Sequence, residues 1–237
     1  MTDLSALDGA TIVFDLDGTL VDSAPDLIGT LNVILKQEGI DPLPFEEGRP
    51  FIGHGARRLI ERGFAAQGRP VPAERVPELF ERFIAHYDRH SADLTRPYPG
   101  VVACLTQMKA AGARLAVCTN KLTALSTPIL EKLDLAQFFD AVVGADSAPA
   151  PKPDARHLLH TVEVAGGRIE RTVMVGDAAT DAGAARAAKA ALILVSFGYT
   201  EIPAAELAPD ILVDHYDQMA NACVRLLTAC PAQSERL

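Results

Sequence analysis

The sequence predicts an α/β fold in which a parallel sheet is interrupted, directly after its first strand, by an insert made of helices. A short apolar segment, Thr11–Phe14, ends in Asp15. Residues 22–94 show helical periodicity and no convincing strand. After Pro99, short apolar segments alternate with amphipathic ones, as in parallel strands joined by crossover helices. We therefore expect a Rossmann-like core, residues 1–21 and 95–237, and an inserted helical domain, residues 22–94.

The first strand carries two carboxylates at its end. Thr11–Phe14 is β-branched or aromatic, and Gly18 supplies the flexible backbone that lets the chain turn away. Side chains two residues apart on an extended segment point the same way, so Asp15 and Asp17 can converge on one small volume. Such crowding is costly unless a cation or a proton is shared there.

Three amphipathic segments make up the insert, and Asp22 or Ser23 is placed to cap the first. The expected helices cover Ala24–Glu38, Ala56–Phe64 and Ala73–His90. In the core, the expected later strands are Arg114–Cys118, Ala141–Val143, Thr172–Val175, Ala191–Val195 and Ile211–Val213. The expected core helices are Gly100–Ala111, Leu122–Leu133, Asp154–Ala165, Ala178–Ala188 and Tyr216–Thr228, the second one uncertain or kinked because it contains Pro128.

Polar side chains follow the expected core strands. In an open parallel sheet, functional groups gather beyond the carboxyl ends of the strands. The residues found there are Asp15, Asp17, Thr119, Asn120, Lys121, Lys152, Asp177 and Asp181. Taken singly, each has a structural explanation, such as a helix cap or a solvated loop lysine. Their concentration at one sheet edge indicates a functional site.

The charges of this cluster indicate its chemistry. Four ionised carboxylates in one crevice repel one another and require a cation, and oxygen ligands favour Mg²⁺. With Lys152, the metal would provide enough positive charge to admit a phosphate group. A carboxylate nucleophile, an adjacent carboxyl acid, a metal and a Lys/Thr pair suit phosphoryl transfer through an aspartyl phosphate.

Four segments resemble the motifs of the haloacid dehalogenase-like hydrolase superfamily, and within it the phosphoglycolate phosphatase-like family. They are Asp15–Asp22, Cys118–Lys121, Pro151–Asp154 and Gly176–Asp181, and the resemblance spans nearly the whole chain. It implies a magnesium-dependent phosphatase of small phosphate monoesters, most of all 2-phosphoglycolate. One departure is Ala178, where the family usually carries Ser, so one possible hydrogen bond is absent.

The resemblance also implies the roles of individual residues. Asp15 is the nucleophile and Asp17 the general acid and then base, while Thr119, Asn120 and Lys152 hold the phosphate. The implied metal ligands are Asp15, the backbone carbonyl of Asp17, and Asp177, with Asp181 in support.

The inserted domain, residues 22–94, resembles the cap that closes over the site in this family and selects the leaving group. Within it, Ile52–Arg57 is similar to the phosphoglycolate phosphatase cap loop. We expect His54, Arg57 or Arg58 to meet the substrate's carboxylate. The structural alternative is that Arg57 pairs with Glu61 and Arg58 lies on a solvated face.

The sequence also allows other functions. A phosphatase or mutase acting on another small sugar phosphate is the strongest rival. A phosphonatase would need a cap lysine, yet none occurs between Lys36 and Lys109, and Asp17 favours phosphate over halide chemistry. A non-enzymatic phospho-acceptor switch is more remote, since its acidic pair and its acceptor Asp lie on different strands and it needs no helical insert.

Composition limits the partners and the location. A net charge of -9 and a pI near 5.1 disfavour binding to nucleic acid or to acidic membranes. The longest apolar run, Ala190–Val195, is far too short to span a membrane. Four cysteines without C-x-x-C spacing favour reduced thiols and a cytoplasmic location. Both a monomer and a homodimer remain open.

Overall fold

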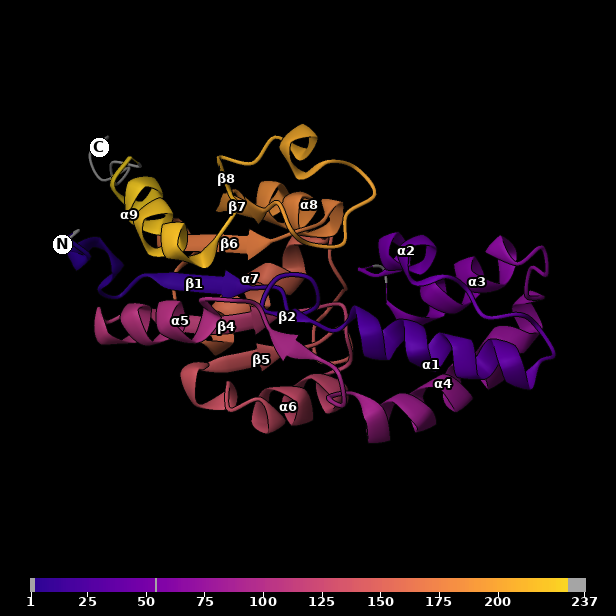
Figure 1. The fold of residues 1–237 in the computed structure, drawn as a ribbon. Helices are drawn as coiled ribbons and strands as arrows, with labels where there is room; N and C mark the ends of the chain where they lie inside the picture. Colours follow the sequence, from indigo (N-terminus) through magenta and orange to yellow (C-terminus); the bar gives the residue numbers. More distant parts are fainter. Residues whose placement is uncertain (1–2, 54, 230–237) are drawn as a thin grey trace.

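The structure, a computed structural model of the chain, describes residues 3–53 and 55–229. Its main sheet has six parallel strands in the order β5-β4-β1-β6-β7-β8 (Figure 1). The strands are β1 (Thr11–Phe14), β4 (Arg114–Cys118), β5 (Ala141–Val143), β6 (Thr172–Gly176), β7 (Ala191–Val195) and β8 (Ile211–Val213). This arrangement confirms the predicted α/β fold and its parallel core.

The first strand lies in the centre of the sheet, between β4 and β6. Thr11 pairs with Arg114 on one side and with Thr172 on the other. All four residues of β1 are buried, as expected for a continuous apolar run covered on both faces. Asp15, directly after β1, therefore lies at the point where the strand order reverses, which is where open α/β sheets place their ligands.

Helices cover both faces of the sheet. Ile12 and Phe14 share one hydrophobic cluster with helices α5 (Val101–Ala110) and α9 (Met219–Ala229). Val13 faces the opposite cluster, formed with α7 (Ala155–Val164) and α8 (Ala179–Ala188). The alternation of side chains along β1 thus supplies both layers of the core. Helix α6 (Thr123–Lys132) packs near β5 and runs without interruption through Pro128.

The segment after β1 forms a helical group beyond the carboxyl ends of the strands (Figure 1). Its helices are α1 (Ala24–Gln37), α2 (Phe45–Gly48), α3 (Ala56–Ala66) and α4 (Val76–His90). They enclose a hydrophobic cluster that includes Leu31, Ile60 and Phe83 and continues into the core through Leu125 and Ile129 of α6. Short 3₁₀ turns lie at Ser5–Leu7, Arg49–Phe51, Ala73–Arg75, Ala136–Phe138, Ile169–Arg171, Ala204–Leu207 and Tyr216–Gln218.

Several local predictions need correction. Residues 22–94 are not free of strand, because Asp22 belongs to β2 (Val21–Asp22), which pairs antiparallel with β3 (Arg96–Pro97) where the chain leaves and re-enters the core. Two-residue strands are too short to show a period of two. Ser23 is the N-cap residue of α1 but makes no side-chain cap, since its hydroxyl donates to Asp17.

Two helices begin later than predicted, after a 3₁₀ turn: α4 at Val76 and α9 at Met219. The short helix α2 was not predicted, because four residues carry too little periodicity. Among the described residues, no helix has the length and apolar character needed to cross a membrane.

Candidate active site

A cavity of about 550 Å³ lies where the carboxyl ends of the central strands meet the helical insert. The strands point toward α1–α4 in Figure 1, so the residues after each strand face the insert. The core contributes Asp15, Asp17, Thr119, Asn120, Lys121 and Lys152 to the cavity wall. The insert contributes Arg57, Arg58, Phe80, Phe83 and Tyr87, among others. Polar groups therefore line the core side, and the insert adds aromatic rings and positive charge.

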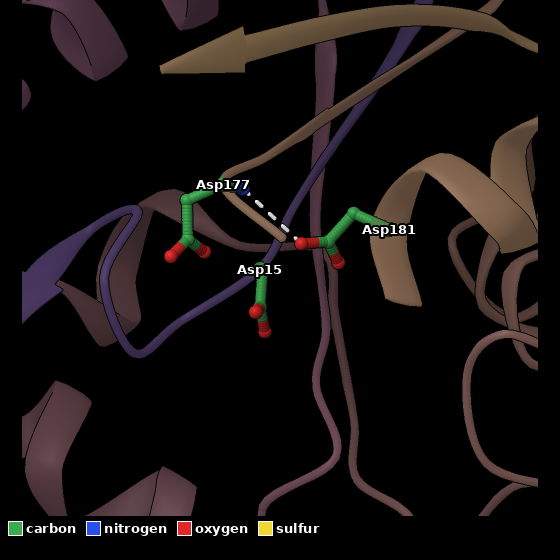
Figure 2. A group of neighbouring side chains, drawn as sticks. All are labelled: Asp15, Asp177 and Asp181. Carbon is green, nitrogen blue, oxygen red and sulfur yellow. Dashed lines mark hydrogen bonds between the residues drawn. The ribbon is translucent and has the colours of Figure 1, made fainter. Parts of the chain in front are cut away.

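Three aspartates gather at the core end of this region (Figure 2). Asp15, Asp177 and Asp181 are buried, and each offers an oxygen within 4.8 Å of the others. Buried carboxylates this close repel one another unless a cation neutralises them, and their oxygens are the ligands that Mg²⁺ prefers. The donor set fits a hard divalent cation.

Asp15 is held through one of its two oxygens. Its Oδ1 accepts a hydrogen bond from the Leu16 backbone N–H at 2.7 Å and lies 2.9 Å from the Lys152 ammonium. Burial raises the pKa of Asp15 to about 6, although the charge of Lys152 opposes the rise. The Oδ2 atom has no hydrogen-bond donor among the described residues, so it is available to a ligand or to phosphorus.

Asp177 is oriented from two directions. Its Oδ1 accepts from the Thr19 hydroxyl at 3.0 Å, and its Oδ2 accepts from the Tyr199 backbone N–H at 2.6 Å. Burial, and then the negative charge of Asp181, raise the pKa of Asp177 well above its ordinary value. A bound cation would reverse this cost by favouring the ionised carboxylate.

Asp181 binds the backbone at the start of α8 and the ammonium of Lys152. Its Oδ2 accepts the backbone N–H groups of Asp177 and Ala178, at 3.1 and 3.0 Å, and its Oδ1 lies 2.6 Å from the Lys152 ammonium. Both oxygens therefore already have partners. This geometry suits the supporting role expected for Asp181 more than a direct metal contact. Ala178 uses its backbone N–H here.

Lys152 is almost fully buried between two carboxylates. Burial alone would lower its pKa, but the charges of Asp15 and Asp181 raise it above its ordinary value. Its backbone is held by Asn120, whose side-chain amide donates to the Lys152 carbonyl (3.1 Å) and accepts from its N–H (2.9 Å). The Asn120 side chain thus fixes the Lys152 loop. Because that side chain is occupied, only the backbone of Asn120 is left to contact a phosphate. Thr119, also buried, accepts the Lys121 N–H through its hydroxyl.

Asp17 lies apart from the three-aspartate cluster. Its two oxygens contact the Lys121 ammonium at 2.8 and 2.9 Å, and one of them also accepts from the Ser23 hydroxyl. The expected convergence with Asp15 is therefore limited: both line the cavity, but a lysine from the next strand neutralises Asp17. Although burial opposes it, the Asp17 charge raises the pKa of Lys121 above its ordinary value.

Two of the three residues expected to determine specificity, Arg57 and Arg58, lie in the cavity wall. His54 lies outside the described residues. Arg57 places its guanidinium 4.3 Å from the centre of the Phe80 ring, and Arg58 pairs with Glu61 at 3.0 Å. The alternative pairing of Arg57 with Glu61 is thus wrong, because the i, i+3 spacing from Arg58 makes the contact instead. The other half of that alternative is confirmed, since the Arg58 side chain is 69% exposed and lies on a solvated face. Both arginines line the cavity.

Sequence reasoning assigned no role to several residues that shape the site. Lys121 follows an expected strand but has no predicted role, although it pairs with Asp17, and the sequence pattern gives no role to Tyr199, whose backbone N–H holds Asp177. His157 is buried on α7, where it accepts the Lys152 backbone N–H at 3.2 Å. Its position five residues after Lys152 was the only signal available. Nothing in the pattern of α4 distinguished Tyr87 from the rest of that helix's apolar face.

Comparisons with known proteins identify the family of the chain. Residues 12–195 match the family model of the haloacid dehalogenase-like hydrolases. A phosphoglycolate phosphatase of Caulobacter vibrioides is 53% identical over 237 residues, covering 100% of both chains, and one of Agrobacterium fabrum is 43% identical over 92% of this chain and 93% of its own. The crystal structure of a predicted phosphoglycolate phosphatase from Haemophilus somnus superposes with a TM-score of 0.83 at 29% identity, covering 90% of this chain and 97% of that one. The chain therefore belongs to the haloacid dehalogenase-like hydrolase family.

Proposed function

We propose that this protein is a magnesium-dependent phosphatase that hydrolyses 2-phosphoglycolate through an aspartyl-phosphate intermediate. The observation that carries the proposal is the buried Asp15, whose Oδ1 is held by Lys152 and whose Oδ2 is left unpaired beside two further aspartates. The names of the relatives at 53% and 43% identity support the substrate.

In the first step, Asp15 Oδ2 attacks phosphorus. An Asp15–phosphorus bond forms, the bond from phosphorus to the ester oxygen breaks, and Asp17 gives a proton to the departing glycolate oxygen. Lys152, the Thr119 hydroxyl and the Asn120 backbone are placed to hold the phosphate oxygens. Asp15, the backbone carbonyl of Asp17, and Asp177 would hold Mg²⁺, with Asp181 in support, and the ion supplies positive charge against the phosphate.

In the second step, water attacks the phosphorus of the acyl phosphate. Asp17 accepts a proton from that water, the Asp15–phosphorus bond breaks, and inorganic phosphate and free Asp15 result. Asp17 therefore ends the cycle protonated, ready for the next substrate. Its contact with Lys121 keeps the carboxylate at the cavity wall between the steps.

Residues 22–94 are proposed to act as a cap domain over a catalytic core of residues 1–21 and 95–237. The cavity supports this division, because core and insert both line it. A cap at this position would exclude water during phosphoryl transfer. In that cap, His54, Arg57 and Arg58 are proposed to favour an anionic leaving group.

The charge proposed for the cap arginines can be tested directly. Arg57→Ala and Arg58→Ala should each lower kcat/KM for 2-phosphoglycolate, since each removes a positive charge from the cavity wall. Steady-state kinetics at low and high salt would measure the loss and its screening. Unchanged turnover in both variants would remove the arginines from the proposal.

Phosphate release from a panel of small esters tests the function as a whole. We expect 2-phosphoglycolate to be the best substrate, and a chelator to abolish release until Mg²⁺ is restored. A better sugar phosphate in the panel, or isomerised product, would favour the phosphatase or mutase alternative. Release from no ester at all would favour a phospho-acceptor switch.

Free, buried Cys104, Cys118 and Cys223 support the further proposal of a cytoplasmic location.

A further inference from the structure

Lys121 and Tyr87 meet at the cavity wall, one from the core and one from the insert. Lys121 follows β4, and Tyr87 lies on α4, 34 positions earlier in the chain. The Lys121 ammonium lies 4.7 Å from the centre of the Tyr87 ring. Both residues line the cavity, and both are nearly inaccessible to solvent.

The Tyr87 hydroxyl is an unpaired donor. It is buried, and no described residue accepts its proton, while the Lys121 ammonium lies close enough to interact with the hydroxyl oxygen as a donor. A buried hydroxyl left unpaired costs about 1–3 kcal/mol, so such a group at a cavity wall is suited to a ligand. Burial raises the pKa of Tyr87 to about 12, which keeps the hydroxyl protonated and able to donate at neutral pH.

Lys121 also has donor capacity to spare. An ammonium carries three N–H donors, and Lys121 directs hydrogen bonds to the two oxygens of Asp17. Besides Asp17, the hydrogen-bonding group that acts on it within the described ranges is the Tyr87 hydroxyl. By contrast, the ammonium of Lys152 is committed to Asp15 and Asp181, and Arg58 to Glu61.

We propose that Lys121 and Tyr87 form a subsite for the carboxylate of the leaving group. This inference rests on the proposed function, because that function places the ester oxygen next to Asp17. In 2-phosphoglycolate the carboxyl carbon is two bonds from that oxygen. The cation that touches Asp17 is therefore within reach of the carboxylate, and the Tyr87 hydroxyl beside it supplies a second donor.

The subsite explains how the cavity could select an α-carboxylate over a neutral group of the same size. The surrounding wall is apolar, with Phe83 stacked on Tyr87 at 5.9 Å between ring centres and Leu125 nearby. In such surroundings, a site built to hydrogen-bond a charged group rejects an analogue that lacks it. Arg57 and Arg58, which line the same cavity, would then favour the anionic leaving group through their charge, while Lys121 and Tyr87 make the direct contacts.

The test compares 2-phosphoglycolate with ethyl phosphate, which keeps the ester oxygen and the first carbon but lacks the carboxylate. Tyr87→Phe keeps the stacked ring and removes only the hydroxyl. We expect it to lower the ratio of kcat/KM values for the two esters about tenfold, chiefly through KM for 2-phosphoglycolate, since a hydrogen bond to a charged group is lost. Lys121→Met should lower the ratio at least as much.

Tyr98→Phe is the matched control. Its hydroxyl is also buried without a hydrogen-bond partner, but Tyr98 is not part of the cavity wall. It should leave the ratio unchanged. Arg57→Ala should lower the ratio less than Tyr87→Phe does, since the charge of this exposed arginine is screened by solvent. An equal fall for both esters in Tyr87→Phe and Lys121→Met, or an equal shift in Tyr98→Phe, would overturn the subsite.

A binding measurement separates the subsite from the reaction. Calorimetry with the Asp15→Asn protein should show tighter binding of 2-phosphoglycolate than of ethyl phosphate, and a second substitution, Tyr87→Phe, should remove about tenfold of that preference. Absence of turnover by the wild-type protein, with this binding preference intact in Asp15→Asn, would contradict the proposed function alone. Normal turnover with a preference that ignores both Tyr87 and Lys121 would contradict the subsite alone.

Discussion

Asp15, the proposed nucleophile, is held in one orientation by its neighbours. The Leu16 N–H and the Lys152 ammonium both contact Oδ1, so rotation of the carboxylate is restricted and Oδ2 is directed to the remaining space. Lys152 also limits the rise in the pKa of Asp15 that burial causes. A nucleophile must be ionised, so the same lysine that is proposed to hold phosphate also helps to prepare the attacking group.

Asp15→Asn should abolish turnover, because the amide keeps the shape but provides no nucleophile. Phosphate release should fall at least about a thousandfold, as for the loss of other catalytic nucleophiles. Thermal unfolding should show no loss of stability, since a buried carboxylate with a raised pKa is costly to keep ionised. Asp134→Asn is the control: its positive φ of 55° suits Asn, and activity should stay unchanged.

His157 holds the backbone of Lys152, and we propose that it positions this lysine. The Lys152 N–H donates to its Nδ1, so its Nε2 must carry the proton and donate to the Val143 carbonyl, 3.2 Å away. Only the neutral imidazole can make both contacts. Burial lowers the pKa of His157 to about 4 from an ordinary value of 6.5.

The pH dependence of stability follows from this shift. A depressed histidine pKa contributes stability that is full above pH 6.5 and is lost as the pH falls toward 4, by about 3 kcal/mol. Asp15 has a raised pKa, so its effect on the pH dependence of stability has the opposite sign. This effect is the same in wild type and in His157→Gln and cancels when the two are compared. The free energies of unfolding of wild type and His157→Gln, measured with urea, should therefore converge as the pH falls from 6.5 to 4. A difference in the free energy of unfolding that stays constant with pH would contradict the assignment of a neutral imidazole to His157.

At the scale of elements, α8 sets the position of the Lys152 loop. Gly183 lies on the face of α8 that meets Pro153, the residue after Lys152, and a Cβ added there would come within 2.5 Å of the Pro153 ring. A proline ring cannot move aside as the end of a flexible side chain can. The absence of a side chain at Gly183 thus allows the helix and the loop to approach.

Gly183→Ala should displace this loop and lower kcat about a hundredfold, because small misplacements near the reacting groups are expensive. Stability should fall by about 1–3 kcal/mol through overpacking. Gly29→Ala is the matched control within α1, where an added Cβ meets nothing within 4 Å. It should raise stability by about 0.5–1 kcal/mol and leave kcat unchanged, as kinetics and thermal melts of both variants would show.

At the scale of the whole molecule, the parallel sheet collects acidic groups that would otherwise repel. Asp15 follows β1, while Asp177 and Asp181 follow β6, the neighbouring strand. The pKa values of Asp15 and Asp177 are both raised by burial. The fold therefore stores an electrostatic cost that a divalent cation would relieve.

Mg²⁺ should raise the stability of the protein by mass action, by about 2.7 kcal/mol at one hundred times its dissociation constant. For a chain of this size the thermal midpoint should rise by roughly 5 °C or more. Asp177→Asn should abolish this rise, and sodium chloride at matched ionic strength should not reproduce it. An equal rise with sodium would reduce the effect to general screening.

Much of the fold is encoded in local sequence. All six strands of the main sheet were predicted to within one residue, because each is a short apolar run followed by polar or glycine residues. The major helices were predicted from their apolar spacing, with errors of a few residues where 3₁₀ turns precede them. The two-residue strands β2 and β3 were missed, since they carry no periodic signal.

The sequence alone determined the elements and the cluster of polar residues after the strands, because each is written within a few neighbouring positions. Only the tertiary structure decided which of those residues meet. It placed β1 at the centre of the sheet, paired Asp17 with Lys121 across 104 positions, and set the Tyr87 hydroxyl beside them. Such contacts depend on strand order and on the packing of the insert against the core, and neither leaves a pattern within a single segment.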